Sequence, residues 1–175
     1  MYDPDKTRNY EIGAKGKFGS FSYSLALFHI DWDHFQVDDN AAASGFSIAV
    51  NGATAESDGL EFELNGALTD NLFLRFGYAY ADARVAEDFQ VIDFAFGAPY
   101  AIISSLKGDR LPNSPRQSAT VALDYTHQLL QDWNVRWHLN GSYRSDAISQ
   151  LVSTTPTDPP PFKIDSFSIV NVSVN

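Results

Sequence analysis

Residues 72–80 read LFLRFGYAY, and this stretch decides the fold class. Its large apolar side chains stand at every second position, at Leu72, Leu74, Phe76, Tyr78 and Tyr80. Polar or small residues fill the positions between them. Because successive side chains of a β-strand point to opposite faces, this alternation predicts a strand with one apolar face and one polar or small face.

The same two-residue period recurs on both sides of this stretch. Seven segments show it, and none of the chain shows a sustained helical period. The sequence therefore predicts an all-β protein with an antiparallel up-and-down sheet of about seven strands. The expected strands cover residues 10–18, 21–37, 53–68, 72–86, 116–128, 133–149 and 164–175.

Composition excludes several classes of protein. The chain has 175 residues, a net charge of −10 and no cysteine, which excludes disulfides, thiolate zinc sites and cysteine nucleophiles. The acidic balance disfavours nucleic acid as a partner.

The mean hydropathy is −0.22 and no apolar run approaches ~20 residues, so a transmembrane helix is excluded. A transmembrane β-barrel stays open, because its strands alternate apolar and polar residues. The first six residues have no apolar signal-peptide core.

The connections between the expected strands alternate in length. Short turns at 19–20, 69–71 and 130–132 are separated by long connections at about 38–52, 86–115 and 150–163. Tight turns on one side and long loops on the other are typical of outer-membrane barrels. The long connections also carry acidic residues: Asp38, Asp39, Glu87, Asp88, Asp93 and Asp158.

The two faces of the expected sheet differ in chemistry. The polar face carries charged side chains, namely Glu61, Glu63, Arg75, Asp124, Arg136, His138 and Arg144. In a membrane barrel this face would line a wet lumen and the apolar face would meet lipid. Some of five aromatic residues would then be interfacial anchors: Tyr23, Tyr78, Tyr80, Tyr143 and Trp137. A soluble sandwich, in which the apolar face packs on a second sheet, is the alternative.

In the expected strand 21–37, the apolar side chains change from odd-numbered to even-numbered positions. Its apolar residues are odd-numbered up to Leu27 and even-numbered from Phe28 to Trp32. Two interpretations are open: a β-bulge near 27–28, or local burial of both faces.

Side-chain clusters give no clear chemical site. His29, Asp31 and Asp33 alternate and contain metal-ligand types, but polar rim or lumen residues are the simpler interpretation. Asp38-Asp39-Asn40 has oxygen ligands for calcium but lacks a calcium-loop pattern, which favours a solvated acidic loop. Glu61 and Glu63 share a face, yet nothing supplies a cleft for glycoside chemistry.

No catalytic signature appears either. G-x-S-x-G is absent, and Gly13-Ala14-Lys15-Gly16 is not a phosphate loop. We therefore expect no enzyme activity, no cofactor and no metal. The 86–115 connection is unusually apolar, with residues such as Phe89, Phe94, Phe96 and Tyr100. It is expected either to contact a ligand or to extend the flanking strands, and no individual ligand-binding residue can be assigned.

Four motifs resemble a known family. They are LFHIDWDHFQ at 27–36, NGATAESDGLEFEL at 51–64, LFLRFGYAYADA at 72–83 and GDRLPNSPR at 108–116. Their order and spacing resemble the late barrel strands of TonB-dependent outer-membrane receptors, over about residues 9–175. On this resemblance, residues 1–175 are a partial receptor barrel domain.

The resemblance implies a 22-stranded barrel in the outer membrane of a Gram-negative cell, plugged by an N-terminal domain. Such receptors take up ferric siderophores, cobalamin or oligosaccharides with energy from the TonB complex. The implied partners are lipid, the remainder of the barrel, the plug, TonB and an imported ligand that the sequence does not identify. The plug, the TonB-contacting segment and the final strands are not represented among these residues. A soluble all-β binding or interaction module is the alternative.

Overall fold

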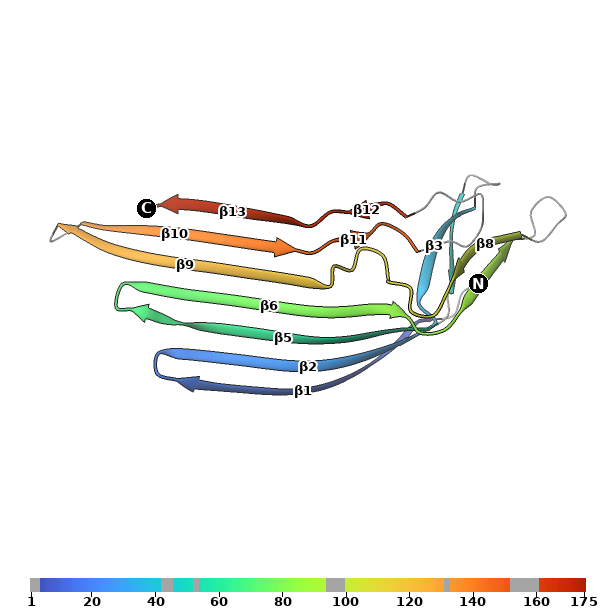
Figure 1. Cartoon of the computed structure of the whole chain (residues 1–175), viewed down its shortest axis with the longest axis horizontal. Coiled ribbons are helices and arrows are strands. Elements are labelled where there is room, and N and C mark those ends of the chain that lie inside the picture. Colours follow the sequence, from blue (N-terminus) through green and yellow to red (C-terminus); the bar gives the residue numbers. More distant parts are fainter. Residues whose placement is uncertain (1–3, 42–45, 52–53, 94–99, 131–132, 152–160) are drawn as a thin grey trace.

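The computed structural model describes residues 4–41, 46–51, 54–93, 100–130, 133–151 and 161–175. Its main feature is one antiparallel sheet with the strand order β1-β2-β5-β6-β9-β10-β13 (Figure 1). The all-β, up-and-down, seven-stranded prediction is confirmed. The strands are β1 Lys6–Phe18, β2 Phe21–Asp33, β5 Thr54–Thr69, β6 Leu72–Val85, β9 Gln117–Leu130, β10 Trp133–Arg144 and β13 Phe167–Val174.

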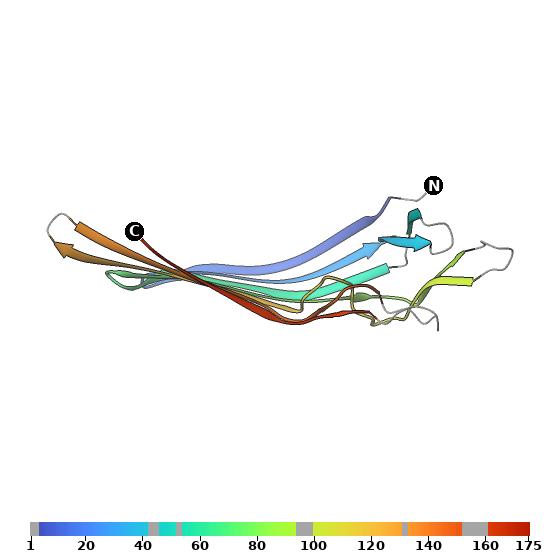
Figure 2. The ribbon, with the colours of Figure 1, turned by 90° about the horizontal axis from the view of Figure 1, so that it is seen from above.

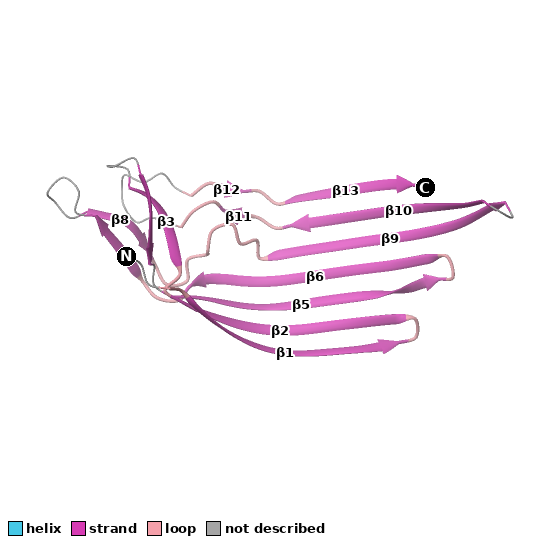
Figure 3. Cartoon of the chain, turned by 180° about the vertical axis from the view of Figure 1, so that it is seen from behind, coloured by secondary structure: helices cyan, strands magenta, loops and turns pink. Residues whose placement is uncertain are grey.

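Three short antiparallel pairs stand at one end of this sheet. They are β3 Gln36–Ala41 with β4 Phe46–Asn51, β7 Phe89–Asp93 with β8 Tyr100–Ser105, and β11 Ala147–Ile148 with β12 Lys163–Ile164. We call this end the loop end, and the opposite end, where β1, β5 and β9 turn into β2, β6 and β10, the turn end (Figure 3). Long connections therefore gather at one end, and short turns at the other.

The sheet is a single curved and twisted layer. Seen along its edge in Figure 2, the seven strands follow one another without a second sheet on either side. Buried apolar side chains among the described residues are few: Phe35, Ala55, Val85, Ala147 and Leu151. A soluble sandwich needs a second layer over its apolar face, and the described residues provide none.

Some expected strands contain breaks. The range 21–37 divides into β2 and β3 because His34, with φ of 56°, turns the backbone out of the sheet. Similarly, 133–149 divides into β10 and β11, and 164–175 begins as β12 before β13. The apolar–polar alternation of the sequence does not reveal such breaks, because it can continue through a residue that is not paired with a neighbouring strand.

The proposed bulge near 27–28 is wrong. The register of β2 with β1 and with β5 runs from Phe21 to Asp33 without a shift. Instead, both faces of β2 are half-buried from Phe28 onward, as the second interpretation expects. The change of parity therefore reflects different surroundings of the two faces of β2 beyond Phe28. The backbone of the strand stays regular.

Gly59 makes this arrangement possible. The Phe28 ring on β2 lies over Gly59 on β5, so close that a Cβ at position 59 would stand 2.2 Å from Phe28 Cζ. The same Cβ would stand 2.4 Å from the backbone oxygen of Tyr80 on β6. Only glycine fits between these two neighbours.

Candidate functional site

The strand register assigns every second residue of the seven strands to an apolar face. One row across the sheet joins Leu74, Leu123, Leu139 and Val172 on β6, β9, β10 and β13. A second row joins Ile12, Leu27, Leu60 and Tyr80 on β1, β2, β5 and β6. The alternation read from the sequence is thus in phase on all seven strands, so one continuous surface results.

The side chains of this apolar face are open to their surroundings. On strands with a neighbour on each side, Leu27 is 50% exposed, Trp137 47% and Leu139 36%. Burying one such side chain fully would stabilise a protein by about 1.5–3 kcal/mol. A continuous, partly exposed apolar surface of this kind marks a region that a membrane or another protein covers.

Aromatic side chains mark the limits of the apolar face. Toward the turn end, Tyr125 and Trp137 stand directly opposite one another on β9 and β10. Toward the loop end, Tyr80 on β6 lies in the row of Ile12, and Tyr10 on β1 lies in the next row, opposite His29. The register also places all five candidate anchors, Tyr23, Tyr78, Tyr80, Tyr143 and Trp137, on this face.

Beyond the row that contains Tyr80, the same face becomes charged. Arg84 lies among three carboxylates, with Glu56 at 2.9 Å, Asp58 at 3.1 Å and Asp82 at 2.9 Å. Arg116 also reaches Asp82 at 2.8 Å. These charges come from β5, β6 and the segment before β9, so the boundary of the apolar face is closed by ion pairs between neighbouring strands.

His29 extends this ion-pair network onto β2. Its Nδ1 lies 2.8 Å from Asp58 and its Nε2 lies 3.1 Å from Asp31. Its ring also contacts Tyr10, with centroids 6.2 Å apart. The expected set of His29, Asp31 and Asp33 therefore lies at the rim rather than in the lumen, and Asp33 pairs instead with Arg8 at 3.3 Å. Within the described part of the chain, no group of three or more such side chains has metal-site geometry.

We expect Arg84→Gln to weaken the network moderately. The side chain is 34% exposed, so solvent screens each of its pairs, and exposed pairs contribute about 0.2–1 kcal/mol. The expected loss is about 1 kcal/mol at low salt, measured by urea unfolding of the full-length protein in lipid vesicles, and smaller at 1 M salt. Arg8→Gln, which breaks one exposed pair, is the control. A loss that is independent of salt would contradict this prediction.

The other face is polar over its turn-end half. All seven charged residues predicted for it lie there by register. Asp124 on β9 accepts from Arg75 on β6 and lies 2.7 Å from His138 Nδ1 on β10. The ladder continues from His138 to Asn140 at 3.4 Å and from Asn140 to Asn171 on β13 at 3.0 Å. Four neighbouring strands are thus joined by polar side chains on one face.

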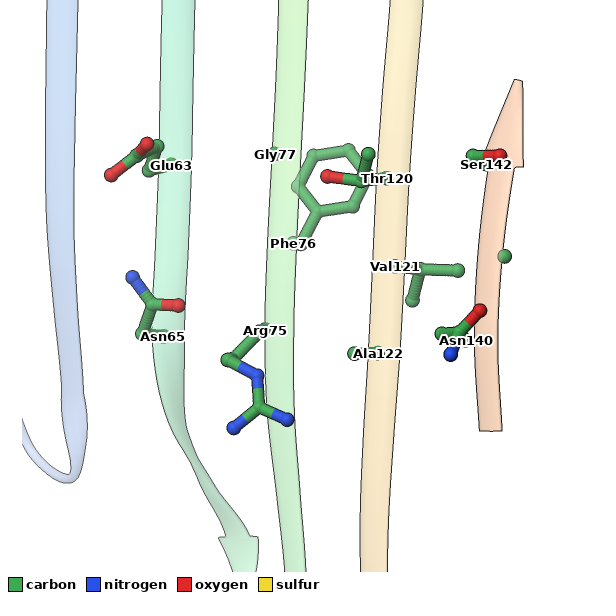
Figure 4. Close-up of a pocket in the computed structure, with 11 residues that line it drawn as sticks. Glu63, Asn65, Arg75, Phe76, Gly77, Thr120, Val121, Ala122, Asn140 and Ser142 are labelled. Carbon is green, nitrogen blue, oxygen red and sulfur yellow. The ribbon is translucent and has the colours of Figure 1, made fainter. Parts of the chain in front are cut away.

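A shallow hollow of about 400 Å³ lies within this polar face. Gly77 forms its floor, and Glu63, Asn65, Arg75, Thr120 and Asn140 surround it (Figure 4). The hollow exists because Gly77 has no side chain to fill the space beside Thr120. Its lining offers both carboxylate and guanidinium groups, which suits a polar partner on this side of the sheet.

At the loop end the polar face becomes apolar. Phe35, 4% exposed, packs with Ala55, Val85 and Leu151, and Trp32, Phe89 and Leu111 lie against this cluster. The Phe35 ring stands edge-on to Phe89 at 5.7 Å and lies 5.8 Å from Trp32. Phe89 belongs to the long 86–115 connection, so that connection packs on the sheet through its base.

The remaining candidate residues fall into two groups. Glu61 and Glu63 both lie on the polar face, where the surface is open and no enclosed cleft surrounds them. Asp38, Asp39 and Asn40 lie in β3, with side chains outside the description. Phe94, Phe96 and Asp158 also lie outside the described residues, so ligand contact by the long connections stays a prediction.

Sequence reasoning missed the Arg84 network and the hollow over Gly77. Both follow from pairing register, which brings Glu56, Asp58 and Asp82 beside Arg84 from two strands. The available signal was the charged alternation Asp82–Arg84 directly after the aromatic run of 72–80, which marks the end of an apolar face.

Comparison with known proteins gives one consistent result. The family model described as TonB dependent receptor-like, beta-barrel, matches residues 2–175. The probable TonB-dependent siderophore receptor PiuA of Acinetobacter baumannii is 27% identical over 179 residues, covering 100% of this chain and 22% of that protein. The metal-pseudopaline receptor CntO of Pseudomonas aeruginosa is 29% identical over 122 residues, covering 69% of this chain and 15% of that protein.

Solved structures agree on the fold. The siderophore receptor PiuA from Acinetobacter baumannii superposes with a TM-score of 0.69 at 21% identity, over 99% of this chain and 22% of that one. The ferric yersiniabactin uptake receptor FyuA from Yersinia pestis gives 0.68 at 13% identity, over 97% and 22%. The chain thus spans about a fifth of the length of these proteins.

Proposed function

Because this chain belongs to the TonB-dependent receptor β-barrel family, we propose that residues 1–175 form part of the barrel domain of an outer-membrane receptor for a scarce nutrient. The proposed role is transport and binding, without catalysis. The opposite chemistry of the two faces of a single-layered sheet carries this proposal.

The apolar face fits lipid as its partner. Its aliphatic rows are bounded by tyrosine and tryptophan toward both ends, as in transmembrane barrels with aromatic girdles at the two interfaces. The ion-pair network around Arg84 then lies beyond the hydrocarbon region, at the side of the long loops. We propose the outer membrane of a Gram-negative cell as the location.

The polar face fits a wet lumen that holds other protein. Its ladder from Arg75 to Asn171 and the hollow over Gly77 would face the plug domain. The outer edges of β1 and β13 have no strand partner among the described residues. Because each unpaired backbone group in lipid costs several kcal/mol, these edges call for the neighbouring strands of a closed barrel, with 22 strands in all.

We propose a ferric siderophore as the imported ligand, in preference to cobalamin or an oligosaccharide. The name of the relative PiuA, a probable TonB-dependent siderophore receptor, supports this choice. Within this chain, the loop-end cluster around Phe35 would support the loops that contact the ligand. Energy would come from the TonB complex through residues outside this chain.

Uptake by living cells tests this function. The full-length gene is deleted and then restored, and cells are supplied with ⁵⁵Fe bound to a catecholate, a hydroxamate or a carboxylate siderophore. We expect the deletion to abolish uptake of at least one complex, and restoration to recover it only when TonB is present. Equal uptake of all three complexes in deleted and restored cells would contradict the siderophore proposal, and a cobalamin-uptake assay on the same strains tests the next class.

The alternative of a soluble binding module makes an opposite prediction. A barrel in detergent migrates differently in gels before and after boiling, because the folded sheet resists the detergent until it is heated. A soluble module would stay in solution without detergent. The exposed apolar face disfavours the module, since it would leave the side chains of a whole sheet face in water.

A further inference from the structure

The segment 106–116, which contains the GDRLPNSPR motif, completes the sheet at the loop end. β6 runs to Val85, whereas β9 begins only at Gln117, so the last third of β6 lacks a regular partner on that side. Segment 106–116 takes its place through backbone hydrogen bonds: Gly108 N to Val85 O, Val85 N to Asp109 O, Leu111 N to Ala83 O and Ala81 N to Arg116 O.

The other side of this segment holds the connection that follows β10. The Asn113 amide donates to the Ile148 carbonyl at 2.8 Å, and the Ser145 amide donates to the Gln117 carbonyl at 2.9 Å. The Gln117 amide in turn donates to Ser145 Oγ at 3.0 Å. Backbone hydrogen bonds therefore join residues 145–151 to segment 106–116 and to Gln117 at the start of β9.

The segment also fixes the base of the β7–β8 hairpin. Asp109 accepts from Ser105 Oγ at 3.0 Å and from the Leu106 amide at 2.8 Å, and Ser105 is fully buried. Asp88 accepts from the Lys107 amide at 2.7 Å. One segment thus contacts the bases of the two long connections, 86–115 and 145–163.

Arg110 is the side chain that joins these two sides. Its Nη1 lies 3.1 Å from Asp146 Oδ2, and its Nη2 donates to the Asp146 carbonyl at 2.9 Å and to the Ser114 carbonyl at 3.3 Å. The Arg110 side chain is 20% exposed, whereas that of Asp146 is 44% exposed. The hydrogen bond from Arg110 holds the pKa of the Asp146 carboxyl below its ordinary value.

We propose that Arg110 is a positioning residue that holds segment 106–116 and residues 145–151, the bases of the two long connections, in one arrangement through its contacts with Asp146 and Ser114. The proposal gives a role to the 108–116 motif. The proposal rests on the proposed function in one respect, namely that these connections are the loops that face the ligand.

Hydrogen–deuterium exchange of the full-length receptor without ligand tests the proposal. In Arg110→Gln, we expect two amides to exchange about 10-fold faster: Asn113, which joins segment 106–116 to Ile148, and Ser145, which donates to Gln117 beside that segment. A charge-assisted hydrogen bond contributes about as much as such a factor requires. The Val85 and Leu111 amides, which join the segment to β6, should change less than about 3-fold.

Two further variants make the test specific. Asp146→Asn keeps the carbonyl that accepts from Arg110, so its effect should be smaller than that of Arg110→Gln. Arg116→Gln removes an arginine of the same motif that pairs with Asp82 on β6 rather than with Asp146, so it should leave Asn113 unchanged.

Two results would overturn the proposal. One is unchanged exchange at Asn113 and Ser145 in Arg110→Gln. The other is faster exchange throughout β9 and β10, which would make Arg110 a residue for overall stability. Because no ligand is used, either result leaves the uptake experiment as an independent test of the proposed function.

Discussion

A full-length receptor with Val121→Arg is expected to lose about 2–4 kcal/mol of folding stability in a bilayer, the cost of arginine at the lipid-facing midplane of a barrel. Val121 stands in the middle of the apolar positions of β9, opposite Phe76 on β6 and Gly141 on β10. An arginine there would bring its charge into hydrocarbon, with no carboxylate on the neighbouring positions of this face.

The adjacent residue provides a matched control. Thr120 lies on the polar face and lines the hollow over Gly77 together with Glu63. Thr120→Arg should cost clearly less than Val121→Arg, because a wet lumen solvates the added charge and hydrocarbon does not. Urea unfolding in lipid vesicles, followed by the shift between folded and unfolded bands in unboiled gels, measures both variants. Equal losses for the two variants would contradict the assignment of the faces.

Alternation in the sequence was sufficient for the fold because the sheet has only one layer. Each strand needs a face toward lipid and a face toward the lumen, so period two persists along its whole length, as in 72–80. The prediction was weakest at the loop end. There His34 leaves the ladder and segment 106–116 replaces a strand without regular pairing, and neither feature changes the alternation.

The surfaces were predictable to different degrees. Charged residues of the polar face, such as Asp124 and His138, could be assigned by parity alone. The ion-pair network around Arg84 could not be assigned in this way. His29 and Arg84 have the same parity as the residues of the apolar face, and they differ from them only in how close they lie to the loop end. The distance of a residue from the loop end depends on the pairing register, which is set by contacts between strands. The contacts of Arg110 with Asp146 depend on the same long-range arrangement.

Gly59→Ala is expected to destabilise the receptor by about 3 kcal/mol, at the upper end of overpacking costs. The added Cβ would meet Phe28 Cζ at 2.2 Å and the Tyr80 carbonyl oxygen at 2.4 Å. The ring can turn away, but the carbonyl belongs to the neighbouring strand β6. To avoid the clash with this carbonyl, β5 and β6 would have to separate locally. This separation would also weaken the nearby ion pairs of Arg84 with Glu56 and Asp58.

Gly77→Ala is the matched control, because its Cβ would meet only Thr120 Oγ1 at 2.9 Å. A hydroxyl can rotate, so we expect a change below about 1 kcal/mol, partly offset by the lower backbone entropy of alanine in the unfolded chain. A second variant, Gly59→Ala with Phe28→Leu, separates the two clashes. If the ring alone matters, this variant should recover most of the stability. We expect it to recover little, since the Tyr80 carbonyl remains in place, and full recovery would show that Gly59 is required by Phe28 and not by the β5–β6 pairing.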